Sequence, residues 1–259
     1  MHPELNLIID WSKEVGQIIK NGFGQEHQIE LKSEIDLVTE IDKQSEAYLI
    51  AEIRKRFPEH TIVGEESGTL NGHHSESTWY IDPLDGTSNY AHGVPIFSVS
   101  IAYAYRGKVQ MGVVFDPMQN ECFYAERGQG AYRNGQKLQV SATNSLIRSM
   151  LVTGFPYDVH TTRENNLDYF RNFLLKAQAV RRLGSAALDM CYVAAGRLDG
   201  YWELSLKAWD IAAGVLMVEE SGGIVTKLDG TPFTLMPPYD IVVANPHIHP
   251  LMMDVVKAT

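Results

Sequence analysis

Three closely spaced apolar segments in the middle of the chain constrain the fold more than any other feature. They span residues 96–105, 108–116 and 120–127. All three are rich in β-branched and aromatic residues, which favour strands. The breaks between them, such as Arg106-Gly107, are short enough to join only neighbouring antiparallel strands. Asn134-Gly135 adds a strong hairpin signal. The sequence therefore predicts an antiparallel meander in its first half.

Two helices are expected before this meander. Apolar side chains recur every three or four residues over 5–20 and again over 40–57, where Phe57-Pro58 ends the pattern. Two short apolar segments, "TIV" and "TWYID", follow and are typical of buried strands. The first half is thus expected to contain two helices and a sheet.

The rhythm changes after about residue 145, where strands begin to alternate with helices. We expect helices over residues 163–178, 186–196, 208–223 and 250–258. We expect strands over residues 149–155, 179–185, 198–204, 223–227 and 240–246. Such alternation is typical of a layered α/β unit. No flexible linker separates residues 1–145 from residues 146–259, so we expect the two halves to pack tightly as one unit.

Composition excludes some classes of protein. The chain has 259 residues, 44% of them hydrophobic, and a net charge of -10, so it can bury a large core and is not disordered by composition. Its acidity argues against nucleic-acid or anionic-membrane partners. Cys122 and Cys191 lie in apolar segments and are expected to be buried and reduced. We found neither a signal peptide nor a membrane-spanning segment, and expect a cytoplasmic protein.

The stretch "TWYIDPLDGTSNY" places two acids three residues apart at the end of a predicted strand. Asp82 and Asp85 would repel each other unless a cation such as Mg²⁺ lay between them. Pro83 would stiffen the connection, the Leu84 carbonyl would offer a further oxygen, and Gly86 would let the backbone approach a ligand closely. The alternative is an ordinary Asp-Pro and Asp-Gly turn that caps a helix.

Other acids also lie at the ends of predicted elements. Glu65 and Glu66 follow the strand "TIV", Glu203 ends the strand "GYWE", and Asp210 opens a helix. Asp42 falls in the first turn of another helix. Each has an ordinary explanation, because acids in such places are commonly solvated, cap a helix or complement its dipole.

Taken together, these segments point to one family. The segments "DLVTEID", "GEES", "DPLDGTSNY" and "AWDIAAG…GG", in this order, resemble the inositol monophosphatase family of Mg²⁺-dependent, lithium-sensitive phosphatases. The resemblance runs from about residue 5 to about residue 250. It implies a layered αβαβα sandwich similar to that of fructose-1,6-bisphosphatase, and a homodimer.

The resemblance also implies a site that binds two to three Mg²⁺ ions. The first ion would be bound by Glu65, Asp82 and the backbone oxygen of Leu84. The second would be bound by Asp82, Asp85 and Asp210. A third, weaker ion would be bound by Glu65 and water. Lys32 is expected near this third ion, with Asp36 behind the site.

Catalytic and substrate-binding roles follow from the same resemblance. Thr87 would hydrogen-bond the attacking water, and Asp42 would support Thr87, so that the two form a general-base relay; Glu65 is also expected to be catalytic. The N–H groups of Gly86 and Thr87 would bind phosphate. The residues expected to contact the rest of the substrate are Asp85, Gly184, Ser185, Ala186, Glu203 and Asp210.

The predicted function is therefore hydrolysis of inositol monophosphate, or of a related small polyol or sugar phosphate, by a metal-activated water. The metal site alone does not exclude the same chemistry on the 2'-phosphate of NADP, fructose 1,6-bisphosphate, histidinol phosphate or 3'-phosphoadenosine 5'-phosphate. A regulatory binding protein with little catalysis is a different class of answer, since some family members associate with transcription or ribosome-assembly machinery.

Two further sequence features, a pair of arginines and a pair of histidines, each have two interpretations. Arg181-Arg182 could contact a second phosphate, although an exposed basic pair at a strand end is the simpler interpretation. His73-His74 could suggest a transition-metal site, but no further ligand has suitable spacing, which favours a solvated loop.

Overall fold

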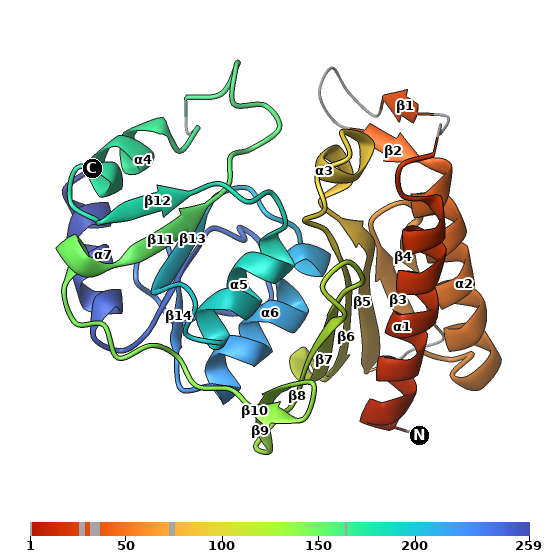
Figure 1. Cartoon of the computed structure of the whole chain (residues 1–259). Coiled ribbons are helices and arrows are strands. Elements are labelled where there is room, and N and C mark those ends of the chain that lie inside the picture. The colour runs from red at the N-terminus through yellow and green to blue at the C-terminus, as the bar shows by residue number, and fades with distance from the viewer. Residues whose placement is uncertain (1, 26–28, 32–36, 73–75, 164) are drawn as a thin grey trace.

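The structure is a computed structural model that describes residues 2–25, 29–31, 37–72, 76–163 and 165–259. Two β-sheets alternate with three helix layers (Figure 1). The outer helices on one side are α1 (Leu5–Gly22) and α2 (Glu40–Arg56). The central helices are α5 (Ala186–Ala194) and α6 (Ala208–Glu220). The outer helices on the other side are α4 (Leu167–Leu174) and α7 (Ile248–Lys257). This order confirms the expected αβαβα sandwich.

The first sheet has eight strands in the order β10-β9-β8-β7-β6-β5-β3-β4. Along the chain they are β3 (Thr61–Gly64), β4 (Gly68–Leu70), β5 (Ser77–Asp85), β6 (Ser98–Tyr105), β7 (Lys108–Asp116), β8 (Glu121–Glu126), β9 (Gly130–Arg133) and β10 (Gln136–Lys137). The strands from β5 to β10 form the expected antiparallel meander. Positive φ angles at Arg106 and Gly107 give the β6–β7 turn the twist that a tight hairpin needs.

The sheet differs from the sequence expectation at its other edge, where β3 runs parallel to β5. Strand β4, which was not predicted from the sequence, reverses direction and pairs with the outer edge of β3. The chain then returns to the inner edge of β3 in the same direction as β3. An unpredicted short hairpin is thus the reason for the parallel pair.

The second sheet has five strands in the order β12-β11-β13-β15-β14. They are β11 (Met150–Thr153), β12 (Ala179–Arg181), β13 (Gly200–Glu203), β14 (Ile224–Lys227) and β15 (Ile241–Ala244). Strands β12, β11 and β13 are parallel, and β15 is antiparallel to both of its neighbours. The remaining elements are the pair β1 (Ile29–Leu31) and β2 (Leu37–Thr39), the short helix α3 (Thr87–Ala91) and the 3₁₀ turn η1 (Leu146–Arg148).

Helix α4 is shorter than the helix expected over residues 163–178. Asn166 has a positive φ of 71° just before the helix begins. Its buried amide donates hydrogen bonds to Thr153 Oγ1 and the Gly154 carbonyl, and accepts one from the Trp202 indole. These contacts with distant residues hold Asn166 outside the helix, and a local pattern does not reveal them.

Both sheets are buried on both faces, which explains their nearly continuous apolar strands. Ile101 and Tyr103 of β6 face the core beneath α1 and α2, whereas Ala102 faces the core around α5 and α6. In the second sheet Tyr201 faces the central helices and Trp202 faces the outer core beneath α7. Three apolar cores thus join the five layers.

Two further expectations concern the cysteines and the membrane. Cys122 and Cys191 are buried and unpaired, as expected. Across the part of the chain that the structure describes, no helix is both long and apolar enough to span a membrane. The division of the chain at residue 145 stays a prediction.

Candidate active site

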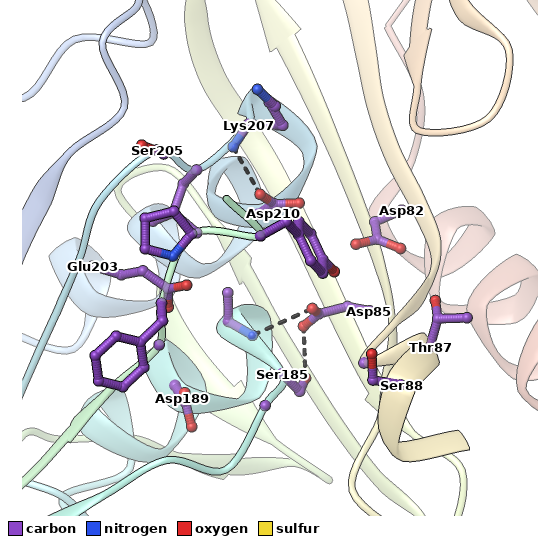
Figure 2. A pocket seen from close by; sticks show the side chains of 18 of the residues that line it. Asp82, Asp85, Thr87, Ser88, Ser185, Asp189, Glu203, Ser205, Lys207 and Asp210 are labelled. Atoms are coloured by element: carbon purple, nitrogen blue, oxygen red, sulfur yellow. Dashed lines mark hydrogen bonds between the residues drawn. The ribbon is translucent and has the colours of Figure 1, made fainter. Parts of the chain in front are cut away.

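A cavity of about 240 Å³ opens at the C-terminal end of β5, where the first sheet faces the N-terminal ends of α5 and α6. It collects residues from distant parts of the sequence (Figure 2). The predicted site residues that line it are Glu65, Asp82, Leu84, Asp85, Gly86, Thr87, Gly184, Ser185, Ala186, Glu203 and Asp210. Asp42 lies behind Thr87 rather than in the cavity wall.

A bulge in β5 explains why its two acids are three residues apart. Asp82 pairs with Ser100 and Asp85 with Ser98, so β5 has one more residue than β6 over this interval. Side chains alternate along a strand, and the extra residue places Asp82 and Asp85 on the same face. Figure 2 shows both carboxylates extending from β5 into the cavity. Strand β5 thus continues through both acids, beyond the turn that the sequence suggested.

Pro83 is tolerated inside this strand because of where it lies. Strand β3 pairs with β5 only as far as Ile81, so Pro83 lies beyond the last β3 pair. A proline cannot donate to a sheet ladder, and at this position no β3 acceptor is left without a donor.

Gly86 follows the bulge and opens α3 with a left-handed φ of 101°. A Cβ atom at this position would lie 3.0 Å from the carbonyl oxygens of both Gly184 and Ile96. Both the backbone conformation and the space around it therefore require glycine. The backbone on either side of the cavity approaches closely as a result.

Thr87 and Asp42 form a buried hydrogen-bonded pair. The Thr87 hydroxyl lies 2.9 Å from Asp42 Oδ1 and 3.0 Å from the Leu84 carbonyl oxygen. Asp42 Oδ2 accepts hydrogen bonds from the backbone and hydroxyl of Thr39, which completes a capping box at the start of α2. Burial raises the pKa of Asp42, and the hydrogen bonds from Thr39 and Thr87 partly offset this effect. Asp42 therefore both caps α2 and orients Thr87.

Asp85 joins the two halves of the molecule. Its Oδ2 accepts a hydrogen bond from the Ser185 hydroxyl at 2.6 Å, which Figure 2 shows, and another from the Ala187 N–H at 2.8 Å. Burial raises the pKa of Asp85 to about 6, although the bonds from Ser185, Ala187 and Ala186 lower it. The carboxylate thus binds the free N–H groups at the start of α5.

Asp210 and Glu203 line the side of the cavity that residues 146–259 form. Asp210 Oδ2 accepts a hydrogen bond of 2.7 Å from the Lys207 N–H at the start of α6. Glu203 accepts one of 2.7 Å from the Tyr201 hydroxyl, and a Cβ atom on Gly154 would lie 2.2 Å from its carboxylate oxygens. Burial raises the pKa of Glu203 to about 7 and that of Asp210 well above its ordinary value.

Glu65 follows β3 in a turn that another acid supports. The buried carboxylate of Glu46 accepts hydrogen bonds from the N–H groups of Glu66 at 2.9 Å and Ser67 at 2.7 Å. A Cβ atom on Gly64 would lie 2.9 Å from this carboxylate. Glu46 therefore determines the position of the turn that presents Glu65 to the cavity.

The cavity concentrates negative charge. Burial raises the pKa of Asp82 well above its ordinary value, and Glu65, Asp85 and Asp210 raise it further. Its most influential neighbours are thus themselves acidic. Such a cluster is costly unless protons or cations compensate it. Hard carboxylate and carbonyl oxygens are the ligands that Mg²⁺ prefers, so the donor set fits this ion.

The carboxylates do not form a ready-made coordination shell. Within the described residues, no three Asp, Glu, His or Cys side chains converge as ligands of one ion. Asp85 and Asp210 instead accept hydrogen bonds from N–H groups at the starts of α5 and α6. The individual ligand assignments therefore stay predictions.

Two buried acids of this region, Glu46 and Asp189, were not predicted from the sequence. Asp189 lines the cavity from α5 and is 1% exposed. An acid within the apolar helix "AALDMCYVAA" is an available sequence signal for it. Lys32, Asp36 and His73-His74 lie outside the described residues.

Comparison with known proteins agrees with this geometry. The family model of the inositol monophosphatase family matches residues 1–258. The chain belongs to the inositol monophosphatase family. The resemblance inferred from the sequence is confirmed.

Relatives within this family carry more than one functional name. Nus factor SuhB of Escherichia coli (strain K12) is 42% identical over 255 residues, which cover 98% of this chain and 95% of that protein. Inositol monophosphatase from Anabaena (Nostoc) sp. PCC 7120 is 41% identical, with a TM-score of 0.90 over 98% of this chain and 95% of that one. An IMPase/NADP phosphatase complexed with Mg²⁺ and phosphate is 27% identical, with a TM-score of 0.86 over 98% and 95%.

Proposed function

We propose that this chain is a Mg²⁺-dependent phosphomonoesterase that hydrolyses a small polyol or sugar monophosphate by direct attack of water. The observation that carries this proposal is a buried group of mutually repelling carboxylates around one small cavity, with the Thr87–Asp42 pair at its edge. Family membership supports phosphatase activity.

The residues that would hold the metal are Glu65, Asp82, Asp85, Asp210 and the Leu84 backbone oxygen. Two to three Mg²⁺ ions bound there would neutralise phosphate charge and lower the pKa of a water. The acids would then compensate positive charge instead of repelling one another. The Mg²⁺ and phosphate named for the IMPase/NADP phosphatase relative are consistent with this assignment.

The Thr87–Asp42 pair would orient the attacking water. A carboxylate can only accept hydrogen bonds, so Asp42 draws the Thr87 hydrogen toward itself. This leaves a lone pair on the Thr87 hydroxyl that accepts a hydrogen bond from water. A threonine is a weak base alone, so its contribution is to position the water and help to remove its proton. The N–H groups of Gly86 and Thr87 would bind the phosphate, and Glu65 would also take part in catalysis.

The size and lining of the cavity favour a small substrate. Its volume of about 240 Å³ lies just below the range of roughly 300–1,000 Å³ that is usual for ligand pockets. Gly184, Ser185, Ala186 and Glu203 offer polar groups to the alcohol part, and we propose that Asp85 and Asp210 also contact it. Such a cavity suits a sugar-sized phosphate better than a dinucleotide.

The other substrates remain candidates within the same chemistry. Arg182 lines the cavity and is exposed, which favours a second phosphate, and the exposed Lys207 lines it as well; Arg181 does not line the cavity. A substrate panel decides this question. It comprises inositol 1-phosphate, β-glycerophosphate, fructose 1,6-bisphosphate, NADP⁺ and 3'-phosphoadenosine 5'-phosphate.

The experiment measures phosphate release from each substrate, with Mg²⁺ and with EDTA. We expect one small monophosphate to dominate by kcat/KM and EDTA to abolish its turnover. Release that persists in EDTA would overturn the metal proposal. Preference for a bisphosphate or NADP⁺ would overturn the substrate proposal.

A second candidate function is a regulatory binding role with little catalysis. It is favoured by the name Nus factor SuhB, which several relatives carry. Asp85→Asn should abolish phosphate release, whereas a role that depends on an outer surface should survive this change. The prediction that the chain has no nucleic-acid partner stays a prediction.

We also propose a homodimer in the cytoplasm and inhibition by millimolar Li⁺. These proposals follow from family resemblance. Light scattering of the purified chain measures the first, and uninhibited turnover at high Li⁺ would contradict the last.

A further inference from the structure

Asp189 is a buried acid that the chemistry described above does not use. It lies in the first half of α5, one helical turn after Ser185, and lines the same cavity. Figure 2 places Asp189 and Glu203 on the side of the cavity away from Asp82 and Thr87. Asp189 thus faces the region where the alcohol part of a substrate would lie.

The fold offers no evident reason for a carboxylate at this position. Asp189 is 1% exposed, and its Oδ1 has no hydrogen-bond partner within the described part of the chain. The side chain of Ser185, not that of Asp189, accepts the capping hydrogen bond of α5. An unpaired buried acceptor is costly, and such exceptions require an explanation. A ligand that donates hydrogen bonds into the cavity would supply one.

The neighbours of Asp189 indicate the chemistry of that ligand. Burial is the main cause that raises the pKa of Asp189. Glu203 raises this pKa further, and Arg182 lowers it. The two acids therefore form an acceptor-rich, net acidic wall. Hydroxyl groups can donate to such a wall, whereas a second phosphate would be repelled by it.

We propose that Asp189 and Glu203 together bind hydroxyl groups of the substrate, and that Asp189 selects polyol monophosphates over esters without hydroxyls and over bisphosphates. This inference rests on the proposed function and specifies its substrate class. Glu203 was expected to contact substrate, and Asp189 is the new member of the pair. The unpaired Oδ1 of Asp189 and its place in the cavity wall carry the argument.

The test compares Asp189→Asn with the wild-type protein on two substrates in Mg²⁺. Inositol 1-phosphate carries free hydroxyls, and phenyl phosphate carries none. We expect kcat/KM for inositol 1-phosphate to fall at least about tenfold, because a site built to accept from hydroxyls loses an acceptor, while phenyl phosphate changes by less than about twofold. The kcat/KM for fructose 1,6-bisphosphate should rise in Asp189→Asn relative to the kcat/KM for inositol 1-phosphate. An equal loss on both monophosphates would overturn the assignment.

Asp168→Asn is the matched control. It makes the same chemical change in the first turn of α4, where Asp168 is exposed and outside the cavity. This control should leave all three rates unchanged. Asp189→Asn keeps the shape of the side chain and replaces a carboxyl whose Oδ1 has no hydrogen-bond partner among the described residues, so the unfolding temperature should stay close to that of the wild type. If it does not fold, Asp189→Ser takes its place with the same expectations.

A binding measurement separates failure of this inference from failure of the proposed function. Calorimetry measures inositol 1-phosphate binding in Mg²⁺ if the wild type does not hydrolyse it. Binding that Asp189→Asn weakens at least about tenfold would support the subsite while the phosphatase proposal fails. Absent or equal binding by the two proteins would overturn the subsite as well.

Discussion

The Thr87 hydroxyl lies 2.9 Å from the Asp42 carboxylate and connects the first residue of α3 with the first turn of α2, 45 residues apart. The same carboxylate completes the capping box of α2 through Thr39. One acid therefore determines both the start of α2 and the position of the Thr87 hydroxyl. Asp42 therefore makes an ordinary helix cap and also the contact with Thr87 on which its proposed functional role depends.

Removing the Thr87 hydroxyl should affect turnover more than stability. We expect Thr87→Ala to lower kcat at least about 100-fold, because general-base assistance typically contributes this much. Thr87→Ser keeps the hydroxyl and should retain most of the activity. Phosphate release at saturating Mg²⁺ and substrate measures both variants. Equal activity of the two variants would show that the hydroxyl has no part in the reaction.

Glu46 should control metal affinity without touching the metal. Glu46→Gln turns an amide NH₂ toward an N–H group of the Glu66–Ser67 turn and so disturbs the turn that presents Glu65. We expect the Mg²⁺ concentration for half-maximal rate to rise about tenfold, as is typical for residues that orient ligands. Glu52→Gln, on the outer side of α2, is the control. An unchanged Mg²⁺ requirement would contradict this role.

Gly86 should tolerate no side chain. Gly86→Ala combines a positive φ with contacts of 3.0 Å to two carbonyl oxygens. Gly93→Ala has a positive φ of 72° but no atom within 4 Å of the new Cβ, so it isolates the backbone cost. We expect urea unfolding to show a loss for Gly86→Ala about 2 kcal/mol greater than for Gly93→Ala. Similar losses would show that the cavity wall moves freely.

Glu203 should make the metal-free protein less stable as pH rises. Its pKa is raised from 4.5 to about 7, so between these values the folded protein keeps a proton that the unfolded chain has lost. Native stability therefore falls through this window, and the cost is complete above about pH 7. Glu203→Gln cannot ionise. Above about pH 7 its free energy of unfolding should therefore exceed that of the wild type by at least about 1.4 kcal/mol, the equivalent of one pKa unit.

Urea unfolding in EDTA at several pH values measures this gain. Glu59→Gln, an exposed acid before β3, is the control and should show no such trend. If the free energies of unfolding of Glu203→Gln and the wild type differed by the same amount from acid to neutral pH, the raised pKa of Glu203 would be contradicted.

Local patterns in the sequence predicted most elements, and the resemblance to a family predicted the residues that meet in the cavity. The apolar periodicity of residues 5–20 and 40–57 corresponds to α1 and α2. The predicted acids that line one cavity are Glu65, Asp82, Asp85, Glu203 and Asp210. These features depend on short-range chemistry or on motifs with specific spacing.

The features that were missed depend on contacts between distant segments. The bond between Glu46 and the Glu66 N–H spans 20 residues, and the bond between Asn166 and Trp202 spans 36. The β5 bulge depends on its register with β6. The importance of Asp189 depends on which face of α5 meets the cavity. No local pattern contains this information.

The most direct test of the account is Mg²⁺ titration of the wild type and Asp82→Asn, read by phosphate release from inositol 1-phosphate and by unfolding temperature. Asp82 accepts a hydrogen bond from the Leu84 N–H and is surrounded by acids, so the neutral variant should fold at least as well without metal. We predict that Mg²⁺ activates and stabilises only the wild type. Equal activation of Asp82→Asn by Mg²⁺ would contradict the proposal that this carboxylate cluster binds the catalytic metal.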